Sequence, residues 1–292
     1  MITAVNYHLW EPCNMRCQFC FATFQDVKKT ILPKGHLPKE QAIDVIIKLA
    51  QAGFEKITFA GGEPTLCPWI NELIYVAKSN GLTTMIVTNG THLTDDFLTK
   101  NQGILDWITL SIDSLDDATN LKTGRAISGK KPITKEGYYE LVDKIKLYGY
   151  GLKINTVVTN CNASEILIDF IEYAQPKRWK LFQVLPIKGQ NDGKVDALLI
   201  NNEQFKLFME NNKTKNNTIQ IVPEYNDQMM GSYAMVDPAG RFFDNSTGTY
   251  IYSKPINEVG IHQAIQEMNY DQNKFIERGG KYNWERTNTK AA

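Results

Sequence analysis

Three cysteines near the N-terminus are the residues of this 292-residue chain best suited to carry chemistry. Cys13, Cys17 and Cys20 follow the spacing CxxxCxxC on one short segment. Three such thiolates bind three irons of a [4Fe–4S] cluster and leave the fourth iron open to a small ligand. A zinc site with His8 or His36 as the fourth ligand is the alternative, although zinc sites more often show paired CxxC motifs.

A second motif suits a ligand on the open iron. Ala60-Gly61-Gly62-Glu63-Pro64 follows a predicted strand, and alone it is weak evidence because Gly-Gly turns are common. Glycines let the backbone come close to a ligand, and a carboxylate accepts hydrogen bonds from an ammonium group. S-adenosylmethionine (SAM) fits both motifs, since it chelates iron through its amino and carboxylate groups. One electron from the cluster then breaks the S–C5′ bond and gives a 5′-deoxyadenosyl radical.

Short apolar runs alternate with amphipathic ones, and this alternation predicts the elements that position the motifs. Strands are expected over residues 5–9, 56–59, 83–87, 107–111, 151–158 and 180–185. Helices are expected over residues 39–52, 69–80, 135–148 and 163–174. The pattern indicates an α/β fold with a parallel sheet and a site at the carboxyl ends of its strands.

The pattern changes after about residue 200. Residues 201–217 are Asn-rich around a predicted helix, and residues 237–240, with the sequence DPAG, predict a hairpin turn. We therefore expect a catalytic domain over residues 1–200 and a C-terminal extension over residues 201–292 that closes the substrate pocket.

Composition narrows the functional class. The chain has 32 basic and 32 acidic residues, and this balance argues against a general binder of nucleic acid or membrane surfaces. It contains no apolar run long enough for a membrane span and no signal sequence before the first predicted strand. Five cysteines, three of them clustered, fit a metal site in a reducing compartment. We expect a cytoplasmic protein without a membrane anchor.

Together, the cysteine motif and the GGEP turn resemble the radical SAM superfamily. The resemblance implies a partial (β/α)6 barrel whose three motif cysteines hold a [4Fe–4S] cluster, with Glu63 as the ligand of the SAM amino group. It also places contacts to SAM at Phe19, Gly61, Gly62, Thr88, Asn89, Ser111, Asp113, Arg125, Asn155 and Gln183.

Longer blocks resemble the viperins within that superfamily. They are residues 5–8, 56–64, 111–114, 153–157, 178–183, 222–224, 232–233 and 278–284. This resemblance implies conversion of a ribonucleoside triphosphate (CTP, UTP or GTP) to its 3′-deoxy-3′,4′-didehydro form, a chain terminator used in antiviral defence. It also implies a one-electron donor such as flavodoxin or ferredoxin. Residues 285–292 do not match the tail of the family.

Basic residues suit a triphosphate substrate. Lys153 and Asn155 lie two apart on one strand and share a face, as do Arg178 and Lys180 near the next strand. Buried cations need anionic partners, although exposure of Arg178 and Lys180 on a solvated approach is the alternative. The expected phosphate contacts are Lys56, Lys153, Arg178, Lys180 and Arg278.

Gln183 is also expected to face inward, yet its parity is opposite to that of Lys180. A bulge, or a strand that begins after Lys180, would reconcile the two. Asn6 and His8 share a face and are expected to hold the ribose or inner phosphates. Tyr233 is expected to donate the final proton or to orient the ribose, and a packed aromatic is the alternative. His8 and Tyr233 are therefore the candidate catalytic residues.

Two other functions remain open. One is a radical SAM reaction on a peptide or a cofactor precursor, although peptide-modifying relatives typically carry extra C-terminal cysteines and this chain has none after Cys161. The other is a non-catalytic nucleotide or metal sensor, which zinc without iron in the purified protein would support.

Overall fold

The computed structural model describes residues 2–214 and 216–284, and within them ten strands form one sheet. The strand order is β10-β9-β8-β1-β2-β3-β4-β5-β6-β7. Neighbours from β1 to β7 are parallel, β8 is parallel to β1, and β9 and β10 are antiparallel. The strands are β1 Ala4–Trp10, β2 Lys56–Gly61, β3 Thr83–Thr88, β4 Trp107–Ser111, β5 Gly151–Val158, β6 Arg178–Gln183, β7 Gln220–Glu224, β8 Met235–Val236, β9 Arg241–Asp244 and β10 Ile251–Pro255.

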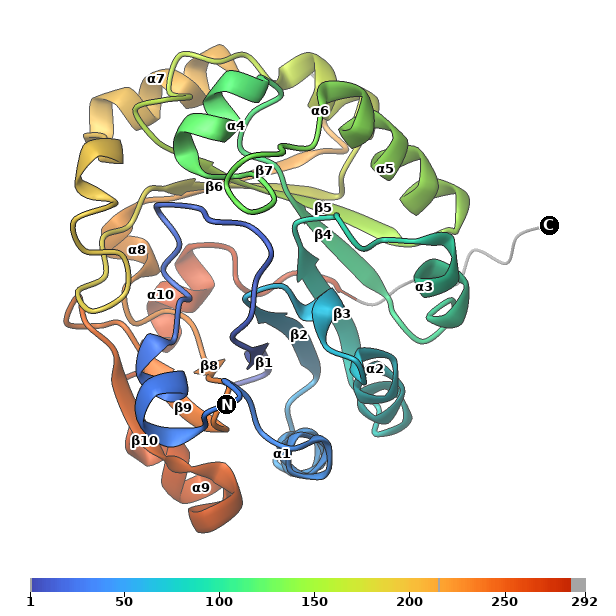
Figure 1. The fold of residues 1–292 in the computed structure, drawn as a ribbon, viewed down its shortest axis with the longest axis vertical. Helices are drawn as coiled ribbons and strands as arrows, with labels where there is room; N and C mark the ends of the chain where they lie inside the picture. The colour runs from blue at the N-terminus through green and yellow to red at the C-terminus, as the bar shows by residue number, and fades with distance from the viewer. Residues whose placement is uncertain (1, 215, 285–292) are drawn as a thin grey trace.

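Helices cover the outer side of the curved sheet (Figure 1). The helices are α1 Lys39–Gln51, α2 Ile70–Ser79, α3 Asp95–Lys100, α4 Asp117–Thr123, α5 Lys135–Leu147, α6 Ile168–Ala174, α7 Asn202–Asn211, α8 Asn226–Met229, α9 Ile256–Gln266 and α10 Gln272–Glu277. Helices between successive parallel strands on one side of a curved sheet define an open α/β barrel. The predicted partial barrel is therefore confirmed.

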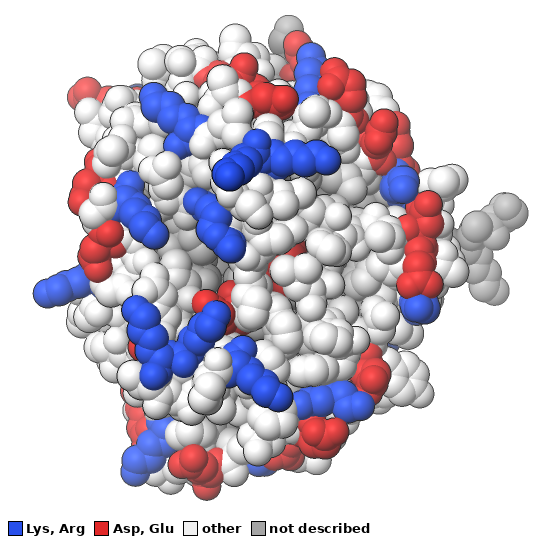
Figure 2. All heavy atoms as spheres, viewed as in Figure 1, with Lys and Arg blue, Asp and Glu red and all other residues white. Residues whose placement is uncertain are grey.

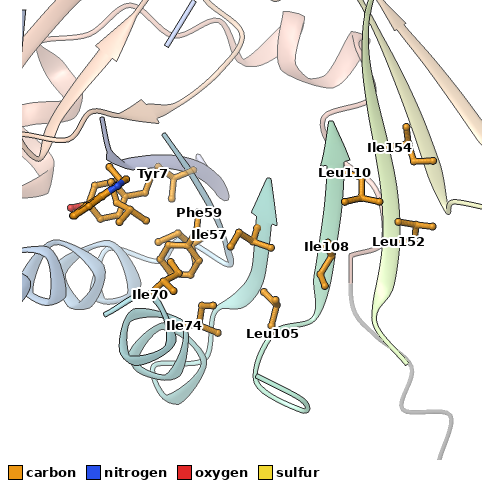
Figure 3. Close-up of a cluster of buried hydrophobic side chains, with 14 of the residues drawn as sticks. Tyr7, Ile57, Phe59, Ile70, Ile74, Leu105, Ile108, Leu110, Leu152 and Ile154 are labelled. Atoms are coloured by element: carbon orange, nitrogen blue, oxygen red, sulfur yellow. The ribbon is translucent and has the colours of Figure 1, made fainter. Parts of the chain in front are cut away.

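Alternation along the parallel strands separates the core from a central cavity. On β2, Ile57 and Phe59 point outward and pack with Tyr7 against α1 and α2 (Figure 3). On β5, Leu152 and Ile154 belong to the same hydrophobic core. The residues that alternate with these along the two strands point the other way and line a cavity inside the barrel. They are Lys56 and Thr58 on β2, and Lys153 and Asn155 on β5. A period of two thus gives each strand one apolar and one functional face.

Two predicted elements have wrong boundaries. The sixth strand spans Arg178–Gln183 rather than residues 180–185, because it pairs with β5 from Lys153 to Val158. The helix expected from residue 163 begins only at Ile168, because Asn162 first closes a turn by accepting from the Thr159 backbone N–H at 2.7 Å.

The segment after residue 200 contributes to both edges of the sheet. β7 extends it beyond β6, and β8 extends it beyond β1. The predicted turn is confirmed, since Gly240 N–H donates to the Asp237 carbonyl at 3.0 Å between antiparallel β8 and β9. No helix among the described residues is long and apolar enough to cross a membrane.

Candidate active site

The cysteine motif lies on the loop after β1, here called the cluster loop (residues 11–23). Cys13, Cys17 and Cys20 all line the cavity. The loop is fixed on one side by the GGEP turn, where Gly62 N–H donates to the Trp10 carbonyl at 2.5 Å and Glu63 N–H to the Pro12 carbonyl at 2.9 Å.

Gly61 and Gly62 are needed for this close contact between two stretches of backbone. A Cβ on Gly62 would lie 2.2 Å from the Glu11 carbonyl oxygen, and one on Gly61 would lie 2.3 Å from the Trp10 oxygen. Gly61 also has φ +147°, which side chains rarely adopt. The glycines thus let the end of β2 meet the cluster loop, a role distinct from the expected approach to a ligand.

The three thiols suit an iron–sulfur cluster better than a single metal ion. Among the described residues, no group of three or more His, Cys, Asp or Glu side chains is arranged to hold one ion. A cubane takes one thiolate per iron, so its ligands need not converge on one point. Burial raises the pKa of Cys13 to about 11 and that of Cys17 to about 12, so both thiols are protonated in the metal-free protein. They release these protons when a metal binds.

Neither histidine considered as a zinc ligand completes such a site. His36 stacks on Trp10 with ring centroids 4.1 Å apart. His8 is buried among the rings of Phe21, Phe24 and Phe243. Burial lowers the pKa of His8 to about 3, so its ring is neutral. It lines the cavity, and its Nδ1 has no hydrogen-bond partner among the described residues.

Glu63 is buried where β2 and β3 end. Its Oε1 accepts from the hydroxyls of Thr65 at 2.6 Å and Thr88 at 2.7 Å, and its Oε2 accepts from the Asn89 backbone N–H at 2.8 Å. Burial raises the pKa of Glu63, while these donors oppose the shift. The carboxylate is therefore held rigidly beside the thiols, as a ligand for an ammonium group requires.

The other expected SAM contacts share this end of the cavity. Asp113 pairs with Arg125 at 2.6 Å, and the guanidinium of Arg125 lies 5.3 Å from the centre of the Phe19 ring. Asp113 also accepts from the Val157 backbone N–H at 2.8 Å. The cavity lining here is completed by Gly61, Gly62, Thr88, Asn89, Ser111 and Asn155.

Gln183 departs from this grouping. It is buried and lines the cavity, as expected, but no bulge interrupts the pairing of β6, so its parity remains opposite to that of Lys180. Its amide donates to the Ile200 carbonyl at 3.2 Å and to Asn202 at 3.1 Å, and accepts from the Asn226 backbone N–H at 3.2 Å. Neither alternative holds, because β6 has no bulge and begins before Lys180, and the amide of Gln183 instead joins the start of α7 to the start of α8.

The five expected phosphate contacts gather at the opposite end of the cavity. Lys56 and Arg178 begin β2 and β6, and Lys153 pairs in register with Arg178. The expectation that the whole site lies at the carboxyl ends of the strands is therefore wrong for the cations. Arg178 is only 1% exposed, which also excludes a solvated approach. All five cations line the cavity, namely Lys56, Lys153, Arg178, Lys180 and Arg278.

This cationic cluster is short of negative charge. Burial and neighbouring cations lower the pKa of Lys56 to about 7 and that of Lys153 well below its usual value. Burial also lowers the pKa of Lys180 to about 8, although Glu224 opposes that shift. Cations that repel one another in a buried site favour a polyanionic ligand.

Glu224, at the end of β7, is one of two residues of this site that no sequence pattern singled out. It is fully buried, its carboxylate pairs with Lys180 and accepts from Tyr233, and Arg278 lies 3.3 Å from its Oε1. Burial would raise its pKa, but the two cations lower it below the usual value. In the sequence, Glu224 belongs only to a short Val-Pro-Glu match, and no charge pattern around it indicates a role.

Tyr233 connects this carboxylate to the cavity. Its hydroxyl accepts from Lys180 Nζ at 2.8 Å and donates to Glu224, and the guanidinium of Arg278 lies 3.6 Å from the centre of its ring. Burial raises its pKa well above the usual value, so the hydroxyl keeps its proton. Asn6, on β1, lines the same cavity, and its backbone N–H donates to the Ala234 carbonyl at 2.9 Å.

Tyr282 is a second residue that sequence reasoning did not single out. Its hydroxyl accepts from Lys153 and from Lys56, the latter at 3.3 Å, and the guanidinium of Arg178 lies 4.0 Å from the centre of its ring. It therefore closes the cationic end of the cavity from the C-terminal segment. The mismatched tail, residues 285–292, lies outside the described residues.

Three clustered thiols, the buried carboxylate of Glu63 and an open α/β barrel are the features expected of a radical SAM enzyme. Comparison with known proteins assigns the chain to the same class. Residues 9–174 match the family model described as the radical SAM superfamily, so the chain belongs to that superfamily. The enzymes of this superfamily use a [4Fe–4S] cluster and SAM. A solved structure titled native anSMEcpe with bound AdoMet shares the fold, with a TM-score of 0.70 at 16% identity over 95% of this chain and 82% of that one.

Closer relatives narrow the class. A protein of Flammeovirga pacifica is 56% identical over 97% of each chain, and it is named an S-adenosylmethionine-dependent nucleotide dehydratase. One of Lacinutrix mariniflava with the same name is 62% identical over 97% of this chain, which spans 59% of that relative's length. The chain belongs to this nucleotide dehydratase family, and the predicted viperin-type membership is confirmed.

Proposed function

We propose that the protein converts a ribonucleoside triphosphate, one of CTP, UTP or GTP, to its 3′-deoxy-3′,4′-didehydro analogue. The nucleotide loses its 4′ hydrogen, expels its 3′ hydroxyl as water, and takes up one electron and one proton. When bound, the cluster and SAM supply the 5′-deoxyadenosyl radical that accepts the hydrogen, for which a first electron is required. A protein such as flavodoxin or ferredoxin supplies both electrons, in the cytoplasm, and the product terminates nucleic-acid chains as an antiviral compound.

The buried cationic cluster carries this proposal. Five cations line one end of a cavity whose other end holds the thiol triad, and Glu224 is the carboxylate that pairs with two of them. A neutral peptide or precursor offers nothing to balance this charge, whereas a triphosphate balances it and places its ribose toward the thiols. Residues 201–292, which contribute Glu224, Tyr233, Arg278 and Tyr282, act in this proposal as the extension that closes the substrate pocket.

Each group has a defined task in this reaction. The cations of β2, β5 and β6 hold the phosphates, and Asn6 with neutral His8 positions the ribose by hydrogen bonds. Tyr233 orients the 3′ hydroxyl and passes a proton to the departing oxygen. Lys180 supplies that proton through the 2.8 Å bond between them in the same step, so the tyrosinate that burial disfavours is not formed.

An anaerobic assay tests the proposal. Reconstituted protein, SAM and dithionite are combined with each of the four ribonucleoside triphosphates separately, and the products are identified by mass spectrometry. We expect one nucleotide to lose the mass of one water, and a deuterium placed at its C4′ to appear in 5′-deoxyadenosine. Abundant 5′-deoxyadenosine with all four nucleotides unchanged would contradict the proposal and leave a radical SAM enzyme with another substrate.

A matched pair of variants connects the product to the cationic cluster. Lys153→Met should raise the KM for the nucleotide at least tenfold, because a charge-assisted contact to phosphate is lost. Lys206→Met removes an exposed charge from α7 and should leave KM unchanged.

A further inference from the structure

The surface around the cluster loop carries an excess of positive charge, although the whole chain has none. Three segments form this surface, here called the basic face: residues 13–23, 122–131 and 187–194. Their exposed charged side chains are one acid, Asp192, and six cations, namely Arg16, Lys122, Lys130, Lys131, Lys188 and Lys194. In a chain with 32 residues of each sign, this imbalance creates a local positive field.

Hydrogen bonds fix these segments against the cysteine motif. The Gln18 amide donates to the Lys122 carbonyl at 3.0 Å, and the Ser128 backbone N–H donates to the Asn14 carbonyl at 2.7 Å. On the other side, the Asn191 amide donates to the Phe19 carbonyl at 3.1 Å. The cations therefore surround the point where the cluster loop meets the surface. Figure 2, which views the molecule onto this loop, shows blue side chains around the middle of the face and most red ones toward its rim.

The charges of the basic face are available to a partner. Within the described part of the chain, none of the six cations forms an ion pair. The carboxylate of Asp192 accepts a hydrogen bond from the Gly189 backbone N–H. Two apolar side chains lie among them: Phe21, 40% exposed, follows Cys20, and Leu121, 43% exposed, precedes Lys122. Apolar groups within a charged rim are the usual composition of a protein–protein interface.

We infer that the basic face is the docking site of the electron donor, an acidic one-electron carrier protein. The inference rests on the proposed function, because a reductive enzyme needs such a donor. Electron transfer slows steeply with distance, so the donor must bind where the cluster loop reaches the surface. Cations there attract an acidic carrier and orient it on encounter. The phosphate-binding cations form a separate buried set at the other end of the cavity, so the exposed set is not required for nucleotide binding.

Charge reversal tests this inference in the complete protein. The variant Lys122→Glu/Lys130→Glu changes the basic face, and Lys146→Glu/Lys177→Glu makes the same change near the amino ends of β5 and β6. The rate of 5′-deoxyadenosine formation is measured with a reduced bacterial flavodoxin, and separately with reduced methyl viologen, a small cation that gains nothing from a basic surface. Circular dichroism verifies that both variants fold.

We expect the first variant to raise the KM for flavodoxin about tenfold and to weaken its dependence on ionic strength. The control variant should leave this KM unchanged, and with methyl viologen neither variant should be slower than the unmodified protein, because a small cation is not attracted by a basic surface. An unchanged flavodoxin KM in the first variant would overturn the inference. So would an equal rise in the nucleotide KM with both reductants, since the face would then guide the nucleotide.

Failure of the proposed function has a different signature. In that case, methyl viologen supports 5′-deoxyadenosine formation but no nucleotide is dehydrated by any variant, including the unmodified protein. The flavodoxin result still decides the docking site, because 5′-deoxyadenosine reports electron delivery whichever substrate is used.

Discussion

Cys17 lies beside Arg125, which opposes the rise that burial causes in the pKa of its thiol. The motif supplies three thiols, one for each of three irons, so the loss of Cys17 leaves one iron without its ligand. Cys17→Ala should therefore abolish the cluster and all cleavage of SAM. Iron analysis, the ultraviolet–visible spectrum and a 5′-deoxyadenosine assay would show the loss.

Cys161 offers a matched control. It lies on a turn where its backbone N–H donates to the Thr159 hydroxyl at 3.2 Å, and it is not among the residues that line the cavity. Cys161→Ala should keep the iron content and the spectrum of the unmodified protein. Retained SAM cleavage in Cys17→Ala would refute the cluster assignment.

The lowered pKa values of Lys56 and Lys180 give nucleotide binding a pH dependence. With pKa values of about 7 and about 8 in the free protein, both lose protons as the pH rises from 7 to 9. A triphosphate raises both values again, so binding above pH 7 takes up protons. Affinity should fall with rising pH, by up to about tenfold per unit for each group involved.

Calorimetry in buffers of different ionisation enthalpy measures this proton uptake directly. Lys56→Met should reduce the uptake, whereas Lys206→Met should not, and the matching nucleoside without phosphates should show no pH dependence. A triphosphate affinity that stays constant between pH 7 and 9 would show that these lysines do not contact the phosphates.

The junction between β2 and the cluster loop makes a steric prediction. Gly62→Ala places a Cβ 2.2 Å from the Glu11 carbonyl oxygen, so two stretches of backbone must separate. This displaces Glu63 from the thiols, and SAM cleavage should fall at least tenfold. Gly81→Ala is the control: nothing lies within 4 Å of its Cβ, and its φ of +82° costs only about 1 kcal/mol of stability. Equal activity of the two variants would refute a tight junction.

The sequence predicts the parallel strands well because their apolar and polar residues alternate. In β2 and β5 the same alternation assigns Lys56, Lys153 and Asn155 to the face opposite the apolar one, which is the face that lines the cavity. The alternation does not predict the beginning of β6, because the charged residues on either side of Trp179 do not look like part of a strand. β8 has two residues, which pair with Asn6 and Tyr7 of β1. The paired residues lie about 230 positions apart in the sequence, so no local pattern predicts this strand.

Glu224 connects distant parts of the chain, because it joins Lys180 of the barrel to Tyr233 and Arg278 of the C-terminal segment. Glu224→Gln leaves two buried cations without their carboxylate, which should lower the free energy of unfolding by about 3 kcal/mol. A bound triphosphate supplies the missing charge, so it should raise the melting temperature more in the variant than in the unmodified protein.

Thermal unfolding with and without nucleotide checks this expectation. Glu277→Gln removes an exposed carboxylate on α10 and should leave both melting temperatures unchanged. Equal stability of Glu224→Gln and the unmodified protein would show that the carboxylate does not hold the C-terminal segment to the barrel.

The grouping of the three thiols at one cavity and much of the cavity lining were predictable, whereas the balance of charge was not. A spacing such as CxxxCxxC is local, so one segment reveals it. Glu224 and Tyr282 matter because of cations that lie up to about 230 positions away, and their own segments show nothing unusual. The position of the cations at the amino ends of the strands likewise depends on where β6 begins, which the local pattern does not mark.

The cavity extends from thiols at one end to cations at the other, and this length has a metabolic consequence under the proposed function. A nucleoside diphosphate or monophosphate would leave some of the buried cations without a phosphate partner, so the enzyme would act on nucleoside triphosphates alone. Its product then enters the polymerase pool with no kinase step between. Output would also follow the energy status of the cell, and fall whenever triphosphates are depleted.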